Sequence, residues 1–291
     1  MGSSIDDGGM GMSTSTQTSS IRQQRPDPAI AEGEALLQKL TQAALRAARA
    51  DVQPPSPEAE AELRSLMEAV QPEHLGVRQP SSSRCSNSTG AEPRVIRTQI
   101  VWHSSDFELC IFLFPDGASI PLHNHPNMTV LSKVLYGRLG VRSYDWVTPP
   151  TATEYAALTA ELERLESDDA ERRAAAPLAP PRAAWPRATA ELTRDKPTAT
   201  LRPNEANVHA FVARGPTAVL DLLLPPYDDD AGRDCHYFVT VDHAQSDEHA
   251  QTRDAPVMLR PAAPPDSLVI KGQAYQGPRI QKRGRPREHE S

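Results

Sequence analysis

The chain has 291 residues, of which 38 are acidic and 31 basic, and its formal net charge is -7. This balance argues against a surface that coats nucleic acid, and no apolar run reaches the ~20 residues of a membrane span. Hydrophobic residues make up only 38% of the chain and prolines number 28, so we expect one folded core with disordered additions.

The three cysteines, Cys85, Cys110 and Cys235, form no Cys-x-x-Cys pair. This argues against a zinc knuckle and a disulfide framework, and it favours a reducing compartment. The first residues, MGSSIDDGGMGMSTSTQTSS, lack the apolar core of a secretory signal. We therefore expect a cytoplasmic and nuclear protein.

The N-terminal third is predicted to be helical after a polar start. Residues 1–29 have little to bury, and we expect them to be disordered. Residues 33–50 carry leucines and alanines at helical spacing, which predicts an amphipathic helix. Ser56 followed by Pro57 is typical of a helix start, and this second helix should end near Pro72.

From residue 95 the pattern becomes that of antiparallel strands, with short β-branched and aromatic runs between turn residues. Further strands are expected at 198–224 and 235–243 and, after a charged loop, within 267–280. The predicted fold class is therefore mainly β. We expect one domain at 30–280, which includes the N-terminal helices, and a basic, flexible tail at 281–291.

Residues 151–194 interrupt the strand pattern. Their first half, TEYAALTAELERLESDDAERRAA, predicts an exposed helix with many charge pairs. The proline-rich APLAPPRAAWPRA that follows is not expected to form regular structure. We interpret the segment as a helical surface insertion between two strands.

The strongest local motif is His123-Asn124-His125. Residues two apart in a strand point to the same face, so two imidazoles can bind one metal ion from one strand. Pro121 and Pro126 keep this backbone out of a helix. A His-x-His alone is more often an exposed polar surface, but apolar strands on both sides favour a buried site here.

The surrounding spacing resembles the first motif of the cupin fold, in which a His-x-His is followed by a glutamate ligand and then by a glycine. The glycine is present as Gly137, but Val130 occupies the glutamate position. The second cupin motif places one more histidine on a later strand, and His209 fits it loosely. The resemblance implies a double-stranded β-helix, or jelly-roll barrel, that holds a metal ion through three histidines.

Three neutral histidines lack the carboxylate of the common 2-His-1-carboxylate iron site. Such a site leaves a divalent metal with open positions and no compensating charge, which suits a substrate that brings its own thiolate. A three-histidine zinc site for hydration chemistry is the rival interpretation.

Longer stretches extend the likeness to a family. They are IPLHNHPNMTVLSKVLYGRLGVRSYDWV at 120–147, VHAF at 208–211, AVLDLLLPPYDDDAGRDCHYF at 218–238 and AYQGPRI at 274–280. Together with the helical segment 54–77, they resemble the plant cysteine oxidases and their animal relative, 2-aminoethanethiol dioxygenase. The resemblance covers about 54–147 and 195–280.

The resemblance implies an Fe(II)-dependent thiol dioxygenase with one iron per chain and O₂ as co-substrate. Such an enzyme oxidises the N-terminal cysteine of target proteins to cysteine sulfinic acid. In plants this feeds an oxygen-sensing N-degron pathway of the hypoxia response. The implied partners are transcription factors like the group VII ethylene response factors.

The resemblance also implies roles for individual residues. Asp221 would orient the substrate amine or accept its proton, and Tyr227 would hydrogen-bond the bound oxygen or the substrate. Cys235 and Tyr237 match a pair that can be cross-linked in the animal enzyme. The implied metal ligands are all histidines: His123, His125 and His209.

Two alternatives stay open. The same site would suit a small aminothiol such as cysteamine, or the chain could be a non-catalytic metal-binding cupin sensor module. The basic segment 282–287 fits a solubilising end, a nuclear signal or, least well, an AT-hook-like DNA contact. Since no exposed apolar helix stripe calls for a partner, we expect a monomer with no membrane or nucleic-acid partner.

Overall fold

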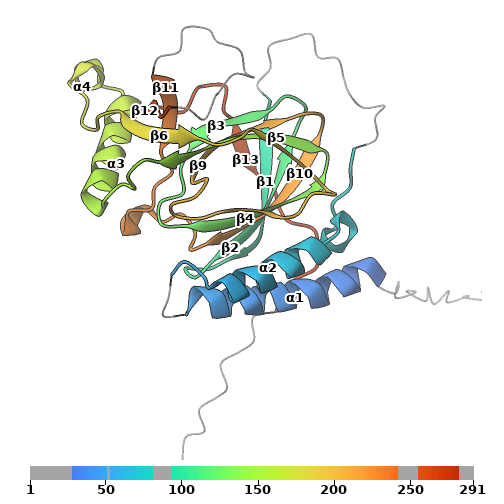
Figure 1. Ribbon diagram of the computed structural model, residues 1–291. Helices are drawn as coiled ribbons and strands as arrows, with labels where there is room; N and C mark the ends of the chain where they lie inside the picture. Colours follow the sequence, from blue (N-terminus) through green and yellow to red (C-terminus); the bar gives the residue numbers. More distant parts are fainter. Residues whose placement is uncertain (1–27, 51–52, 81–93, 242–254, 282–291) are drawn as a thin grey trace, which may run out of the picture.

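The computed structural model describes residues 28–50, 53–80, 94–241 and 255–281 (Figure 1). Among these residues, no helix is long and apolar enough to cross a membrane. The predictions made for residues 1–27 and for the basic segment 282–287 lie outside the described part of the chain.

Two N-terminal helices, α1 (Pro28–Ala48) and α2 (Pro57–Ala69), lie side by side against one sheet of a barrel (Figure 1). The side chain of Ser56 accepts a hydrogen bond from the backbone of Ala59, which confirms the predicted start of α2. Helix α1 begins earlier than predicted because its first turns pack on the short 3₁₀ helix η1 (Pro72–Leu75).

The first sheet has six strands in the order β13-β1-β2-β10-β4-β8. Along β10, Leu220 and Leu222 point towards α1 and α2, whereas the alternate residues Val219 and Leu223 point into the barrel. The strands are β1 (Ile96–His103), β2 (Glu108–Phe114), β4 (Thr129–Tyr136), β8 (Ala199–Leu201), β10 (Thr217–Leu224) and β13 (Ile270–Gly272).

The second sheet has seven strands in the order β6-β12-β11-β3-β9-β5-β7. An additional pairing of β6 with β5 closes six of these strands into a ring. The strands are β3 (Ser119–His123), β5 (Arg138–Trp146), β6 (Arg182–Pro186), β7 (Ala190–Thr193), β9 (Val208–Ala213), β11 (Tyr237–Val241) and β12 (Val257–Ala262).

The inner faces of the two sheets pack on each other. Ile96 and Phe114 of the first sheet share one buried cluster with Ile120, Leu139 and Phe211 of the second. Mostly antiparallel pairing around this core confirms the predicted mainly β, cupin-type double-stranded β-helix.

The segment 151–194 differs from its prediction. It contains the expected helix, α3 (Ala152–Glu166), and a short helix, α4 (Ala170–Ala174), but α3 is not an exposed helix. Tyr155 and Leu158 of α3 are buried against Tyr144 and Trp146 of β5. The charge pattern gave the wrong prediction because α3 also buries an ion pair, Glu161 with Arg164 (2.8 Å). In the sequence these charges suggested a solvated surface.

Three strands, β6, β7 and β12, were missed in the sequence, and β7 lies at the end of the segment interpreted as a helical insertion. The proline-rich run that was not expected to be regular contains β6, and the expected charged loop before 267 contains β12. Strand β6 pairs with both β5 and β12, so distant partners supply its backbone hydrogen bonds. Its proline, Pro186, is the last residue of the strand, where a missing N–H removes at most one donor from the end of the ladder.

Candidate metal centre

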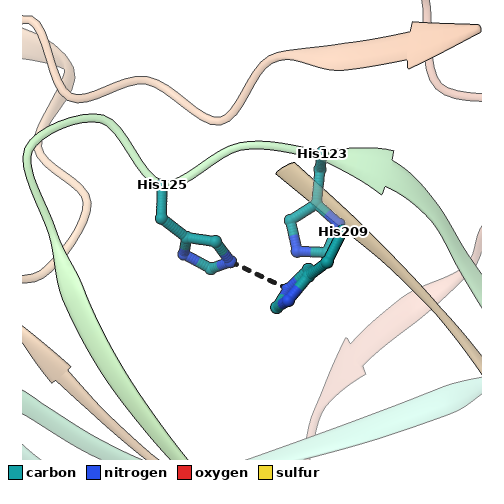
Figure 2. A group of neighbouring side chains, drawn as sticks. All are labelled: His123, His125 and His209. Atoms are coloured by element: carbon teal, nitrogen blue, oxygen red, sulfur yellow. Dashed lines mark hydrogen bonds between the residues drawn. The ribbon is translucent and has the colours of Figure 1, made fainter. Parts of the chain in front are cut away.

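Three buried histidines meet inside the barrel, and their rings point towards one another (Figure 2). His123 ends β3, His125 follows two residues later, and His209 lies on β9 directly opposite His123 in the strand register. One potential ligand atom from each lies within 4.8 Å of the other two. The group contains no carboxylate, and Val130 is buried in an apolar cluster.

Hydrogen bonds to the outer ring nitrogens leave the inner ones free as ligands. Nδ1 of His123 lies 2.9 Å from the carbonyl oxygen of Pro121, to which it can only donate. The hydroxyl of Tyr227 donates to the carbonyl of Asn124 (2.8 Å) and lies 2.8 Å from Nδ1 of His125. Having used its single proton, it accepts from Nδ1–H. Both rings therefore present an unprotonated Nε2, as metal ligands require.

The spacing and charge of the group fit a metal ion. Nε2 of His125 and Nε2 of His209 are 3.1 Å apart (Figure 2). Two nitrogens at ~2.1 Å from one metal ion, at angles of 90–109°, would be roughly 3.0–3.4 Å apart. Burial lowers the pKa of His123 to about 4 and holds the pKa values of His125 and His209 well below their usual range, so the rings are neutral. Three neutral imidazoles on one side of a metal leave its other positions open.

Two asparagines, which were not predicted from the sequence, fix the backbone around His125. Asn207 donates through Nδ2 to the carbonyl of His125 (2.7 Å) and accepts its N–H through Oδ1 (3.2 Å). Oδ1 of Asn124 accepts the N–H of His236 (2.9 Å). The only sequence signal for Asn207 was its position two residues before His209.

Tyr227, Cys235 and Tyr237, which were predicted as site residues, form a cluster beside the histidines. The ring of Tyr227 stacks on that of His125 with centroids 5.2 Å apart, and Tyr237 pairs with His123 in the strand register. Burial raises the pKa of the Cys235 thiol to about 11, and interactions with the hydroxyls of Tyr227 and Tyr237 oppose this rise. The structure thus brings the thiol and both phenols together at the metal centre.

Asp221 lies in the middle of β10, on the face that looks into the barrel. Burial raises the pKa of its carboxyl from 3.8 to about 7, against an opposing hydrogen bond from Ser132. Its Oδ1 has no hydrogen-bond partner among the described residues. Burial raises the pKa of the Tyr227 hydroxyl well above its usual value, and the charge of Asp221 adds to this.

His103, His236 and His243 were not expected to be ligands. His103 is exposed and contacts Glu108 (2.8 Å), and His236 is buried in contact with Asn124. Neither joins the three-histidine group, and His243 lies outside the described residues.

A cavity of about 120 Å³ reaches the metal centre at His209. Its lining is mostly apolar and includes Val141, Leu201 and Phe211. Ser132, Ser143 and Thr200 add hydroxyls. Its size suits a molecule of a few heavy atoms next to His209.

Comparison with known proteins agrees with this geometry. The PCO_ADO family model matches residues 66–280. Plant cysteine oxidase 2 of Arabidopsis thaliana is 33% identical over 76% of this chain and 73% of its own length. Human 2-aminoethanethiol dioxygenase is 31% identical over 79% of this chain and 84% of its own.

Among solved structures, an RmlC-like cupin protein from Desulfovibrio desulfuricans is 16% identical, over 51% of this chain and 99% of its own, with a TM-score of 0.27. The fold is assigned from the strand order of the two sheets and not from this comparison. The relatives' names describe thiol-oxidising enzymes, and the matched region includes the three histidines. The chain belongs to the PCO_ADO family of thiol dioxygenases and is an oxidoreductase.

Proposed function

We propose that this protein is an Fe(II)-dependent dioxygenase that oxidises the N-terminal cysteine of target proteins to cysteine sulfinic acid. The observation that carries the proposal is the buried, carboxylate-free group of three histidines in a chain of this family. One relative of the chain is named a cysteine oxidase. When bound, Fe(II) supplies the redox chemistry that allows O₂ to react with a thiolate.

The histidines select for an anionic substrate. Because all three are neutral, a divalent ion held by His123, His125 and His209 keeps its full charge. A cysteine thiolate would reduce that charge, and the metal in turn favours loss of the thiol proton. An N-terminal cysteine also offers its α-amine next to the sulfur.

Asp221 is proposed to exchange a proton with the substrate. A carboxyl with a pKa of about 7 exchanges protons near neutral pH, and its free Oδ1 can accept a hydrogen bond from an amine. The hydroxyl of Tyr227 hydrogen-bonds the ring of His125 and orients it. Because Tyr227 stacks on that ring, it would contact a substrate only at the side of the ring. The family resemblance suggests a cross-link between Cys235 and Tyr237, whose side chains interact.

The proposed partners are proteins that expose an N-terminal cysteine, such as transcription factors of the group VII ethylene response factor type. Their oxidised termini would enter an N-degron pathway and link protein lifetime to oxygen supply. This role requires a cytoplasmic and nuclear enzyme. Comparing the location of the full chain with that of a chain lacking 282–287 tests the nuclear part.

A small aminothiol is the second candidate substrate, because another relative is named 2-aminoethanethiol dioxygenase. One experiment separates the candidates. Protein loaded with Fe(II), or with Zn²⁺ as a control, is given O₂ and either a Cys-initiated peptide, the matching Ser-initiated peptide or cysteamine, and the products are weighed.

The proposal expects two added oxygen atoms on the Cys-initiated peptide with Fe(II), and none with Zn²⁺ or on the Ser-initiated peptide. Oxidation of cysteamine alone would favour the small-aminothiol enzyme. No oxidation of either thiol would leave a metal-binding module without turnover and overturn the proposal.

A further inference from the structure

A charged contact joins the N-terminal helices to the segment that leads into β9. Glu60 of α2 is only 7% exposed, and its carboxylate accepts hydrogen bonds from Nε (2.8 Å) and Nη2 (2.7 Å) of Arg202. Such a bidentate pair fixes the orientation of the guanidinium as well as its distance. Arg64, one turn further along α2, pairs with the same carboxylate. We call Glu60 and Arg202 the α2 bridge.

The carboxylate of Glu60 is charged although it is buried. Burial alone would raise its pKa, but hydrogen bonds from Arg202 and Arg64 outweigh burial and hold the pKa below its usual value. Removing either member of the α2 bridge therefore leaves the other without its counter-charge. The contact strongly constrains where Arg202 lies relative to α2.

Arg202 also begins a tight turn. Its N–H donates to the carbonyl of Glu205 (2.8 Å), and the N–H of Glu205 donates back to the carbonyl of Arg202 (3.1 Å). The side chains of these two residues pair as well. Because only Pro203 and Asn204 lie between them, the turn at 202–205 is fixed as one unit with Arg202.

The far side of the turn is held by β5. Oδ1 of Asp145 accepts the N–H of Ala206 (2.6 Å), and Oδ2 pairs with Arg187 (2.8 Å), which also contacts Glu205 (3.2 Å). Ala206 has a φ of 53°, in the left-handed region that disfavours residues with a side chain. Such a conformation persists only where the surrounding contacts fix the backbone. The chain therefore enters β9 in one defined position.

Asn207 connects the turn to the metal centre. It is 1% exposed, and its Nδ2 donates both protons, one to the carbonyl of Arg202 (3.2 Å) and one to the carbonyl of His125 (2.7 Å). Its Oδ1 accepts the N–H of His125 (3.2 Å). His209 follows two residues later on β9. A continuous series of contacts thus runs from the α2 bridge to the backbone of His125.

We propose that Glu60 and Arg202 are positioning residues of the metal centre. Through the turn at 202–205 and Asn207, they hold the backbone of His125 in the place that metal binding requires. This inference rests on metal binding by the three histidines, which is part of the proposed function, and adds a residue of the N-terminal helices to that centre. A contact that only fastened α2 to the barrel would change stability and leave metal binding as it is.

Binding of Co(II) to the full chain tests the α2 bridge apart from turnover. The visible absorption of bound Co(II) depends on the number and arrangement of its ligands, and competition with a chelator gives its affinity. The variants are Glu60→Ala, Arg202→Ala and the double variant. Glu62→Ala is the matched control, because Glu62 lies on the same helix and forms an exposed ion pair with Arg46 (2.7 Å). Leu40→Ala is a second control that lowers stability without touching the bridge.

We expect the Co(II) affinity to fall about tenfold in Glu60→Ala and in Arg202→Ala, and the absorption of the saturated protein to change, because groups that orient metal ligands act in this way. The double variant should lose no more than either single variant, since the two residues act as one unit. Glu62→Ala and Leu40→Ala should keep the affinity and the absorption of the wild type.

Three results would overturn the proposal: wild-type affinity and absorption in the folded single variants, additive losses in the double variant, or equal losses in Leu40→Ala. Denaturant unfolding shows whether each variant is folded before Co(II) is added. If Glu60→Ala does not fold, Arg202→Lys replaces it, because lysine keeps the charge but cannot form the bidentate pair. Arg202→Lys should also bind Co(II) more weakly and with changed absorption, and wild-type behaviour would equally overturn the proposal.

Loading the same proteins with Fe(II) and adding O₂ and a Cys-initiated peptide separates this proposal from the proposed function. Weaker Co(II) binding in the bridge variants, with no peptide oxidation by the wild type, would reject the dioxygenase activity and keep the positioning role. Peptide oxidation by the wild type, with unchanged Co(II) binding in the bridge variants, would reject the positioning role and keep the activity.

Discussion

The two sheets of the barrel differ in what covers them and in what they carry. The first sheet buries its outer face against α1 and α2, where Leu220 and Leu222 meet Leu40 and Leu63. The second sheet carries His123 and His209 on the face that it turns towards the first sheet. The difference indicates that the first sheet mainly provides stability, whereas the second provides metal binding.

Removal of a ligand should have the largest effect and should be confined to the second sheet. His209→Asn leaves two histidines, so we expect loss of bound iron and a fall in thiol oxidation to the level of metal-free protein. Iron content and peptide oxidation are measured together. His103→Asn, the same change at an exposed histidine of the first sheet, should keep both. Full activity of His209→Asn would reject the metal centre.

Opening a cavity beneath the first sheet should affect stability alone. Leu40→Ala removes a fully buried side chain between α1 and the sheet, which should lower the free energy of unfolding by about 2–5 kcal/mol. Denaturant unfolding gives this value. Iron bound per folded molecule should not change, and a large loss of iron in Leu40→Ala would contradict the division between the sheets.

Asp221 is the ionisable group on the inner face of β10, so it tests whether the first sheet is purely structural. Its pKa is about 7 when folded against a usual 3.8, so the folded state holds a proton that the unfolded state releases. Its contribution to stability is therefore full below the unfolded pKa and is lost as the pH rises through 7.

Asp221→Asn stays neutral and should lack this loss. Unfolding of chelator-treated protein at about pH 5 and about pH 8 should show a pH-dependent drop in the wild type that exceeds the drop in the variant by on the order of a few kcal/mol. The metal is removed with a chelator because a bound cation would shift the pKa of Asp221. Equal drops in the wild type and the variant would show that folding does not raise the pKa of the Asp221 carboxyl.

A smaller effect is expected from the hydroxyl that orients His125. Tyr227→Phe removes the hydrogen bond to Nδ1, and second-shell losses of this kind weaken metal binding about 10–100-fold. Competition with a chelator measures the affinity. Tyr136→Phe, a change in a buried tyrosine of the first sheet, is the control and should leave it unchanged. Equal affinity in both variants would mean that Tyr227 does not set the ligand geometry.

The three-histidine group and the fold class could be predicted because their signals are local or belong to a known pattern. His123 and His125 lie two residues apart beside a strand. Gly137 matches the glycine of the first cupin motif, whereas Val130 stands where that motif has a glutamate. The signal for the start of α2 was also local, since the side chain of Ser56 accepts a hydrogen bond from the N–H of Ala59, three residues further along.

The parts that could not be predicted depend on distant partners. Asn207 acts on His125 from 82 residues away, so no periodicity marks it. Strand β6 is short and lies in a proline-rich run, and it is a strand because β5 and β12 pair with it. The ring of six strands can be recognised only once these pairings are known.

The most direct test of the account is the origin of the oxygen added to the substrate. Iron-loaded protein is mixed with a Cys-initiated peptide under isotopically heavy O₂ in ordinary water, and the product is weighed. The account predicts two added oxygen atoms that are both heavy, on the cysteine sulfur. A product with no heavy oxygen, or no mass gain at all, would contradict it.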